Sequence, residues 1–178
     1  MVEVELKYMI SPSEVNTIKS KLIKLGCQIK NKVIEKDLYY QHPLRDFWKT
    51  DEALRLRRTE NRVELTYKGP RRKSIAKVRK EISVLVSSFG DMHSILTVLG
   101  FKPVAEVVKE RVYYSCPNDI CVTLDDVKGL GYFIELEFKG KLSVNEAVKV
   151  LLDFANKLGI KGIPITKSYL ELLLEKSS

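Results

Sequence analysis

Charged and apolar side chains alternate along much of this chain, and the alternation limits the folds that it can adopt. In residues 3–7, the acids Glu3 and Glu5 and the base Lys7 are separated by single apolar residues, and residues 134–139 repeat the pattern. Successive side chains of a β-strand point to opposite faces of the sheet. Each such segment therefore predicts a strand with one ionic face and one apolar face.

The order of the predicted elements indicates an α+β fold in which most strands follow one another as antiparallel hairpins. Short turns at 60–61, 117–119 and 128–131 separate several of the strands. The eight predicted strands are residues 2–9, 27–41, 52–59, 62–69, 75–86, 101–116, 119–127 and 130–140. Three or four helices are predicted among residues 15–25, 87–100, 143–159 and 165–176, the third of these with the capping pair Ser143 and Glu146. We expect residues 1–178 to form one domain.

The ionic faces of these strands could simply meet water, because an antiparallel sheet often packs only one face on helices. The sorting of the charges favours another arrangement: the acids lie on strands at the two ends of the chain and the bases lie mostly on the middle strands, whereas a surface made for solubility mixes the signs. We therefore expect a closed eight-stranded antiparallel β-barrel with helices packed outside and the ionic face lining a hydrated tunnel. The side chains expected inside are Glu3, Glu5, Lys7, Arg55, Arg57, Glu64, Thr66, Lys68, Lys77, Arg79, Glu81, Lys109, Arg111, Asp125, Glu135 and Glu137.

Composition narrows the partners and the location. The chain has 31 Lys and Arg against 23 Asp and Glu, a formal net charge of +8, which favours anionic partners. The three cysteines, Cys27, Cys116 and Cys121, are odd in number and show no CxxC spacing, which argues against a disulfide framework and gives no support to a zinc site. No apolar run is long enough to span a bilayer and no signal peptide is recognised, so we expect no membrane partner and a cytoplasmic location.

The predicted tunnel has the residue types that phosphoryl chemistry requires. Clustered carboxylates suit Mg²⁺ or Mn²⁺, which are hard ions that prefer oxygen ligands. A facing array of Arg and Lys suits a run of phosphates. Metal ions that bridge the two flanks through phosphate oxygens would position the chain and neutralise developing charge. The glycine-rich phosphate loop GxxxxGK[ST] does not occur.

The ordered motifs along the chain resemble the CYTH domain of the triphosphate tunnel metalloenzymes, which include class IV adenylyl cyclases and thiamine triphosphatases. The resemblance covers nearly the whole chain, and the segments that carry it are VEVELK, ALRLR, LTYKG, KVRKE, KER, LDDVKGLGYFIELE and SYLELL. A lone ExExK is weak, but the ordered set is specific. It implies a tunnel fold and a metal-dependent enzyme that acts on a triphosphate.

The resemblance also implies roles for individual residues. The implied metal ligands are Glu3, Glu5, Asp125, Glu135 and Glu137, with Asp126 as a rival to Asp125 that alternation disfavours. The implied phosphate ligands are Lys7, Arg55, Arg57, Lys68, Arg79, Lys109 and Arg111. The candidates for catalysis are Glu5, Lys7 and Glu81, and Glu81 could instead pair with neighbouring bases.

Three functions remain open at this stage. The first is hydrolysis of a triphosphate with release of the terminal phosphate, on a nucleotide, thiamine triphosphate, inorganic triphosphate or a 5′-triphosphate RNA end. The second is conversion of ATP to cyclic AMP and pyrophosphate, against which the missing His-Phe ahead of ExExK counts mildly. The third is a polyphosphate or nucleic-acid binder without catalysis, which clustered acids disfavour because they repel an anion.

Two further segments have open roles. Ser168 and Tyr169 could plug the tunnel or touch the substrate, but the leucines that follow favour a helix packed on the outer wall of the barrel. The basic loop of Arg71, Arg72 and Lys73 could contact an entering polyanion or be an ordinary solvated hairpin.

Overall fold

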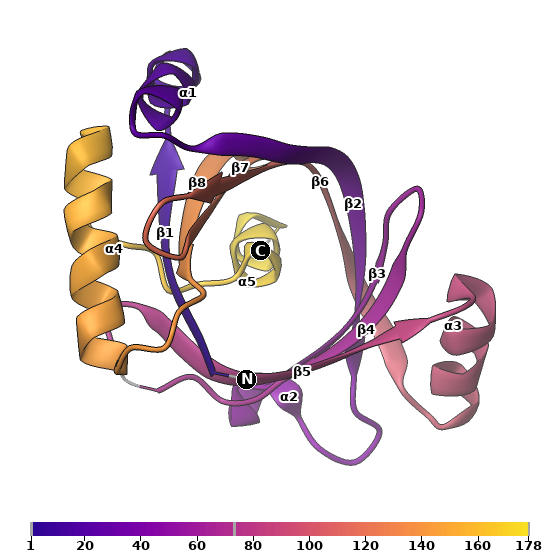
Figure 1. The fold of residues 1–178 in the computed structure, drawn as a ribbon. Helices are drawn as coiled ribbons and strands as arrows, with labels where there is room; N and C mark the ends of the chain where they lie inside the picture. The colour runs from indigo at the N-terminus through magenta and orange to yellow at the C-terminus, as the bar shows by residue number, and fades with distance from the viewer. Residues whose placement is uncertain (1, 73, 178) are drawn as a thin grey trace.

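A closed antiparallel barrel is the centre of the structure, a computed structural model that describes residues 2–72 and 74–177. Within these residues eight strands close in the order β1-β5-β4-β3-β2-β6-β7-β8. Their bounds are β1 Val2–Ile10, β2 Gln28–Gln41, β3 Ala53–Arg58, β4 Val63–Lys68, β5 Lys77–Val86, β6 Lys102–Cys116, β7 Ile120–Val127 and β8 Gly131–Phe138. Figure 1 looks along the barrel and shows the ring of strands. The predicted α+β class and the eight-stranded closed barrel are confirmed.

Apolar side chains on the outer face of the barrel pack against helices, as the alternation predicts. The helices are α1 Val15–Lys24, α2 Phe47–Thr50, α3 Phe89–Val98, α4 Val144–Leu158 and α5 Tyr169–Ser177. Helix α4 packs on β1 and β8, where Leu6, Leu136 and Leu151 are completely buried. The predicted capping box of Ser143 and Glu146 fixes the start of α4. No helix in the described part of the chain is long and apolar enough to cross a membrane.

Helix α5 lies inside the barrel, so the prediction that it packs on the outer wall is wrong. Figure 1 shows it within the ring of strands. Tyr169 and Leu170 are buried in an apolar cluster with Val107 and Phe133, whose strands otherwise point ionic side chains inward. The physical reason is that the inner face becomes apolar toward one end of the barrel, where it provides a surface for the leucine-rich face of this helix. The helix therefore closes that end.

The basic loop between β4 and β5 holds α5 in place. Arg71 forms ion pairs with Glu171 at 2.8 Å and with Asp51 at 2.6 Å, and it donates a hydrogen bond to the carbonyl oxygen of Thr166 at 3.0 Å. Neither role considered from the sequence describes this contact. Lys73, the last residue of the predicted basic loop, lies outside the described residues.

Cys27 and Cys116 form a disulfide, so the prediction against a disulfide is wrong for this pair. The two cysteines are 89 residues apart, and no spacing rule links them. They become neighbours because Gln28 of β2 pairs with Ser115 of β6, which places the residues just outside that pair opposite each other. Cys121 remains a free thiol.

We predict that removing this disulfide lowers the free energy of unfolding by about 4 kcal/mol, because the cross-link closes a long loop in the unfolded chain. Reductant should lower the urea midpoint of the wild-type protein and leave that of the Cys27→Ala/Cys116→Ala variant unchanged. The matched control, Cys121→Ala, should respond to reductant like the wild type. An identical midpoint for the wild-type protein with and without reductant would contradict the prediction.

Candidate active site

The inner face of the barrel is divided along its axis into an apolar end, an ionic middle and an open end. The apolar end holds α5. The ionic middle contains most of the residues predicted to line a tunnel, among them Lys7, Lys109 and Asp125, which are almost completely buried. The closure that we predicted brings Glu5 of β1 opposite Glu137 of β8 and Lys7 opposite Glu135. Asp125 points inward and Asp126 is exposed, as the alternation predicts.

One side of the ionic middle, formed by β1, β3, β4 and β5, is loosely paired. Arg79 lies 3.9 Å from Glu3 and 3.6 Å from Glu81, and Lys77 lies 3.5 Å from Glu5. Lys68 pairs closely with Glu81 and lies 3.9 Å from Glu3. Three buried atoms on this side have no hydrogen-bond partner: Nε of Arg55, Nε of Arg79 and Oε2 of Glu3. Such groups are costly to bury unless a ligand or water meets them.

The opposite side, formed by β2, β3 and β6, is tightly paired. Asp37 accepts hydrogen bonds from Nε and NH2 of Arg57 at 2.6 and 2.7 Å and from Nζ of Lys109 at 2.9 Å. Oε2 of Glu35 lies 3.0 Å from both Arg57 and Lys109, and Tyr113 donates its hydroxyl hydrogen to Oε1. Burial alone would raise the pKa of Glu35, but the charges of Arg111, Lys109 and Arg57 lower it to about 2.

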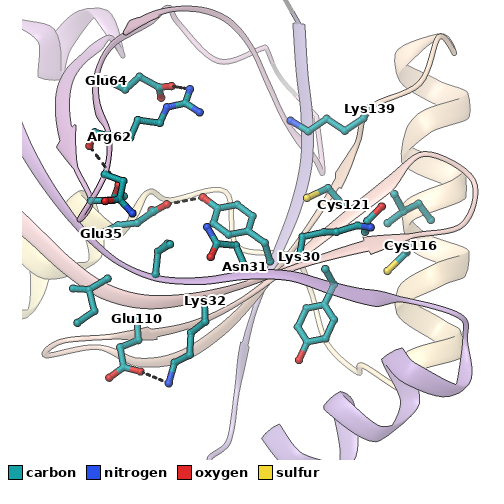
Figure 2. Close-up of a pocket in the computed structure, with 18 of the residues that line it drawn as sticks. Lys30, Asn31, Lys32, Glu35, Arg62, Glu64, Glu110, Cys116, Cys121 and Lys139 are labelled. Carbon is teal, nitrogen blue, oxygen red and sulfur yellow. Dashed lines mark hydrogen bonds and ion pairs between the residues drawn. The ribbon is translucent and has the colours of Figure 1, made fainter. Parts of the chain in front are cut away.

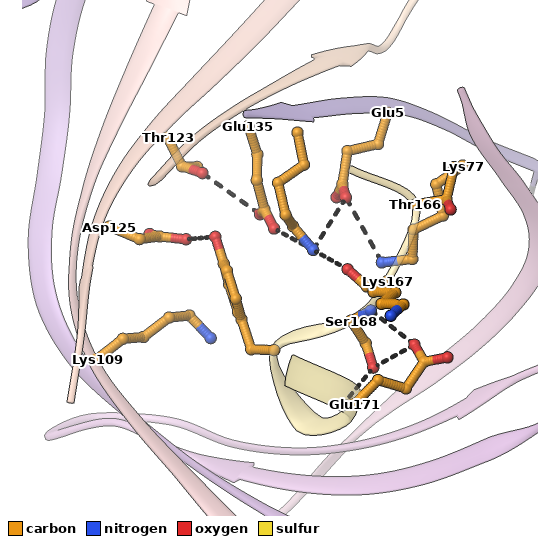
Figure 3. A network of polar contacts seen from close by, with 12 residues as sticks. Glu5, Lys77, Lys109, Thr123, Asp125, Glu135, Thr166, Lys167, Ser168 and Glu171 are labelled. Atoms are coloured by element: carbon orange, nitrogen blue, oxygen red, sulfur yellow. Dashed lines mark hydrogen bonds and ion pairs between the residues drawn. The ribbon is translucent and has the colours of Figure 1, made fainter. Parts of the chain in front are cut away.

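Arg111 and α5 already engage two of the predicted metal ligands. Arg111 pairs with both Asp125 and Glu135, and Tyr169 donates a hydrogen bond to Asp125 at 2.6 Å. Lys7 lies 3.3 Å from Glu135, and its ammonium group is 4.2 Å from the centre of the Tyr169 ring. Figure 3 shows Asp125 and Glu135 directed toward the segment of Thr166 to Glu171. A ligand that binds these two carboxylates has to displace protein partners.

Three other predicted metal ligands form an acidic group with fewer partners. Glu3 and Glu5 lie on β1, and Glu137 lies beside them on β8 and pairs with Lys139, whose side chain is half-exposed. Burial raises the pKa of Glu137 to about 7, and the charges of Glu3 and Glu5 add to this effect. Within the described residues no three metal-ligating side chains converge closely enough to form a ready-made site. The oxygen donors of this group, whose ion pairs with Arg79, Lys68 and Lys77 are 3.5 Å or longer, nevertheless fit Mg²⁺ or Mn²⁺.

Lys68 and Glu81 differ in basicity. Burial lowers the pKa of Lys68 to about 7, and repulsion from Arg55 and Lys77 acts in the same direction. Burial would raise the pKa of Glu81, but its pairing with Lys68 helps to lower it to about 2. A group with a pKa near 7 can accept a proton at neutral pH, whereas a carboxylate with a pKa near 2 is a weak base.

A cavity of about 1590 Å³ lies at the open end of the barrel. Glu35, Glu64, Tyr113 and Cys121, which point inward from four strands, line part of it. Figure 2 shows Glu35, Glu64 and Lys139 around this space. The cavity therefore connects the ionic middle with the outside, on the end opposite α5.

The structure brings the predicted site residues together inside the barrel. The expected separation into an acidic side and a basic side is only partly present. The acids of β7, β8 and β1 lie on neighbouring strands, as expected. The basic side is mixed, because Glu35 and Asp37 lie among Arg57, Lys109 and Arg111. The sequence pattern gave no indication of Glu35, and it assigned no specific role to Asp37 or Lys77. Glu35, Asp37 and Tyr39 alternate along β2 and therefore share one face of the strand. This alternation was the available signal for the two acids, but apolar residues on both faces of β2 obscured it.

Comparisons with known proteins show the family and the fold of the chain. The sequence profile of the CYTH domain matches residues 1–169. A Methanocaldococcus jannaschii protein, provisionally named an adenylate cyclase, is 41% identical over 97% of this chain and 98% of its own length. The solved structure of the PH1819 protein from Pyrococcus horikoshii OT3 is 42% identical, with a TM-score of 0.87 over 98% of this chain and 99% of that chain. A Hippeastrum protein, described as a provisional adenylyl cyclase with a dominant triphosphatase activity, shares the fold at 19% identity, with a TM-score of 0.77 over 98% of this chain and 96% of that chain.

We predict that Glu35 stabilises the fold in a pH-dependent manner. Its folded-state pKa of about 2 lies below its ordinary value of 4.5. The stabilisation, on the order of 3 kcal/mol, is therefore present above about pH 4.5 and is lost as the pH falls toward 2. Glu35→Gln should be clearly less stable than the wild type to urea at pH 7, and the difference should shrink at pH 3.

The matched control for this experiment is Glu110→Gln on the neighbouring strand. Glu110 forms an exposed ion pair with Lys32, so this substitution should change the free energy of unfolding by less than about 1 kcal/mol. A stability difference between Glu35→Gln and the wild type that is equal at pH 7 and pH 3 would refute the assignment.

Proposed function

The chain belongs to the CYTH domain family, and from this premise we propose that it is a divalent-metal-dependent triphosphatase that releases the terminal phosphate of its substrate inside the barrel. The observation that carries the proposal is the loosely paired side of the ionic middle. There two buried guanidinium N–H groups, on Arg55 and Arg79, have no acceptor, and a buried oxygen of Glu3 has no donor. A phosphate bound to a metal ion supplies both of the missing partners.

The proposed roles follow from the positions of the side chains. Arg55, Lys68, Lys77 and Arg79 would bind phosphate oxygens, and Glu3, Glu5 and Glu137 would hold the Mg²⁺ or Mn²⁺ ion. Asp125 and Glu135 would join them if they are released from Arg111. When bound, the ion would neutralise charge on the phosphates and orient them.

The chain's own residues would bind the substrate, exclude water and move a proton. In hydrolysis a water molecule attacks the terminal phosphorus, the bridging P–O bond breaks and the attacking water loses a proton. Lys68, with its pKa of about 7, is better suited to accept that proton than Glu81, one of the three catalytic candidates from the sequence. The shortened diphosphate would leave through the open end.

Cyclase activity is the second candidate, because the M. jannaschii relative carries a provisional adenylate cyclase name. The cavity at the open end gives it no specific support. The ring of its inward-pointing aromatic residue, Tyr113, already has the guanidinium group of Arg111 over it, 5.6 Å from the ring centre. A purine ring would need a free aromatic or apolar face for stacking.

Product analysis tests the proposal. The purified protein should convert inorganic triphosphate to diphosphate and phosphate, and ATP to ADP and phosphate, with Mg²⁺ or Mn²⁺ but not with EDTA. Both products can be followed by ³¹P NMR. Cyclic AMP and pyrophosphate from ATP would establish the second candidate instead. Salt-sensitive triphosphate binding without turnover, unaffected by EDTA, would identify a binder.

We predict that Arg79→Gln weakens triphosphate binding by roughly 10- to 100-fold, because a charge-assisted hydrogen bond contributes about 1.5–3 kcal/mol. The binding constant can be measured by calorimetry. Arg62→Gln is the matched control, because Arg62 pairs with Glu64 at the rim and its side chain is 60% exposed. Equal affinities for the two variants would contradict the assigned position of the phosphates.

A further inference from the structure

One guanidinium group holds two of the carboxylates that the sequence assigns to metal binding. Nε of Arg111 donates a hydrogen bond to Oδ1 of Asp125 at 2.6 Å, and its NH2 group donates to Oδ2 of Asp125 and to Oε2 of Glu135, both at 2.5 Å. All three side chains are more than nine-tenths buried. Strand register sets up this contact, because Arg111 pairs with Asp125, and Glu135 pairs with Thr123, two residues before Asp125. A cation of the protein itself therefore bridges the two acids.

The departure of Arg111 would leave one oxygen on each acid without a cation in hydrogen-bond contact. Tyr169 donates to Oδ2 of Asp125, and Lys7 lies closest to Oε1 of Glu135, at 3.3 Å. Arg111 is the cation that bonds Oδ1 of Asp125 and Oε2 of Glu135 in the described part of the chain. Buried anionic oxygens need a counter-charge, and a hard divalent ion supplies one.

Arg111 also adjoins the space through which a substrate would enter. Its Nε lies 3.9 Å from Glu35, and its guanidinium group lies over the ring of Tyr113. Glu35 and Tyr113 both line the cavity at the open end of the barrel. A guanidinium group forms the same two-pronged pair with phosphate as with carboxylate. A phosphate group that arrives through this cavity can therefore take the place of Asp125 as the acceptor of Arg111.

We propose that Arg111 couples the binding of the triphosphate to the binding of the metal ion. It is the resident counter-ion of Asp125 and Glu135 until a phosphate group accepts its hydrogen bonds, and the two released carboxylates then become available as metal ligands. This inference rests on the proposed function. It makes Arg111 a phosphate ligand, as the resemblance implies, and also a positioning residue for the metal ligands. Because binding linkage is reciprocal, phosphate and metal should raise each other's affinity by the same factor.

Mn²⁺ binding without any phosphate tests the inference apart from turnover, because electron paramagnetic resonance measures free Mn²⁺ directly. Arg111→Gln leaves Asp125 and Glu135 without their bridging cation. The matched control is Arg55→Gln, which also removes a buried positive charge from the bore, whereas Arg55 pairs with Glu64, which is not a predicted metal ligand. The Arg111 variant should bind Mn²⁺ about 10-fold or more tightly than this control.

Inorganic phosphate provides the second part of the test. It should lower the dissociation constant of the wild-type protein for Mn²⁺ by about 5-fold or more, because it draws Arg111 away from the acids. Asp125→Asn removes one of the released ligands. This variant should lose about 10-fold or more in Mn²⁺ affinity relative to the wild type when phosphate is present, and about 3-fold or less when it is absent.

The outcomes distinguish this inference from the proposed function. If Arg111→Gln binds Mn²⁺ no more tightly than Arg55→Gln, or if phosphate does not raise the Mn²⁺ affinity of the wild type, the inference is wrong while hydrolysis can still occur. If the binding results are as expected but no triphosphate is hydrolysed, the proposed function fails although the coupling is present. Should Arg111→Gln not fold, Asp125→Asn decides the matter: an equal loss of Mn²⁺ affinity with and without phosphate would overturn the inference.

Discussion

The burial of ionised side chains inside a closed barrel is the constraint on which the rest of this structure depends. Within the described residues the buried charged side chains comprise five acids and seven bases. An unpaired charge in such a place costs several kcal/mol, so each one has to meet a protein partner, water or a ligand. The barrel meets this demand unevenly: the ion pairs around β2 are short, whereas on β5 the contacts of Lys77 and Arg79 are long, although Glu81 pairs closely with Lys68. This unevenness points to where a ligand belongs.

The barrel and its ionic lining could be predicted because alternation is a local signal. The alternation within each strand indicates which side chains share a face. It correctly predicted that Asp125, and not Asp126, points into the barrel. Pairing across the barrel is not local. Neither the Cys27–Cys116 disulfide nor the contact of Asp37 with Arg57 has a signature in spacing, because they depend on the register of β2 with β6 and with β3.

The position of α5 shows the limit of amphipathic reasoning. A leucine-rich helix has to bury its apolar face, but its sequence does not say on which side of the barrel wall. The deciding feature is the change of the inner face from ionic to apolar at Tyr39, Val107, Val127 and Phe133. Each of these residues ends an ionic row on its own strand, and the four meet only after the barrel closes. Tyr169 then joins the apolar end to the ionic middle through Asp125.

The closed end and the mixed charges together define how an anion can reach the site. With α5 in place, the route to the ionic middle runs through the cavity at the other end, where Glu35 and Glu64 contribute to the lining. The same lining contains Lys30, Lys32, Arg62 and Lys139, so the entrance carries charges of both signs. Beyond them, the Nε groups of Arg55 and Arg79 are the buried donors without acceptors in the described residues. An anion that passes this lining therefore meets donors without acceptors only inside the ionic middle.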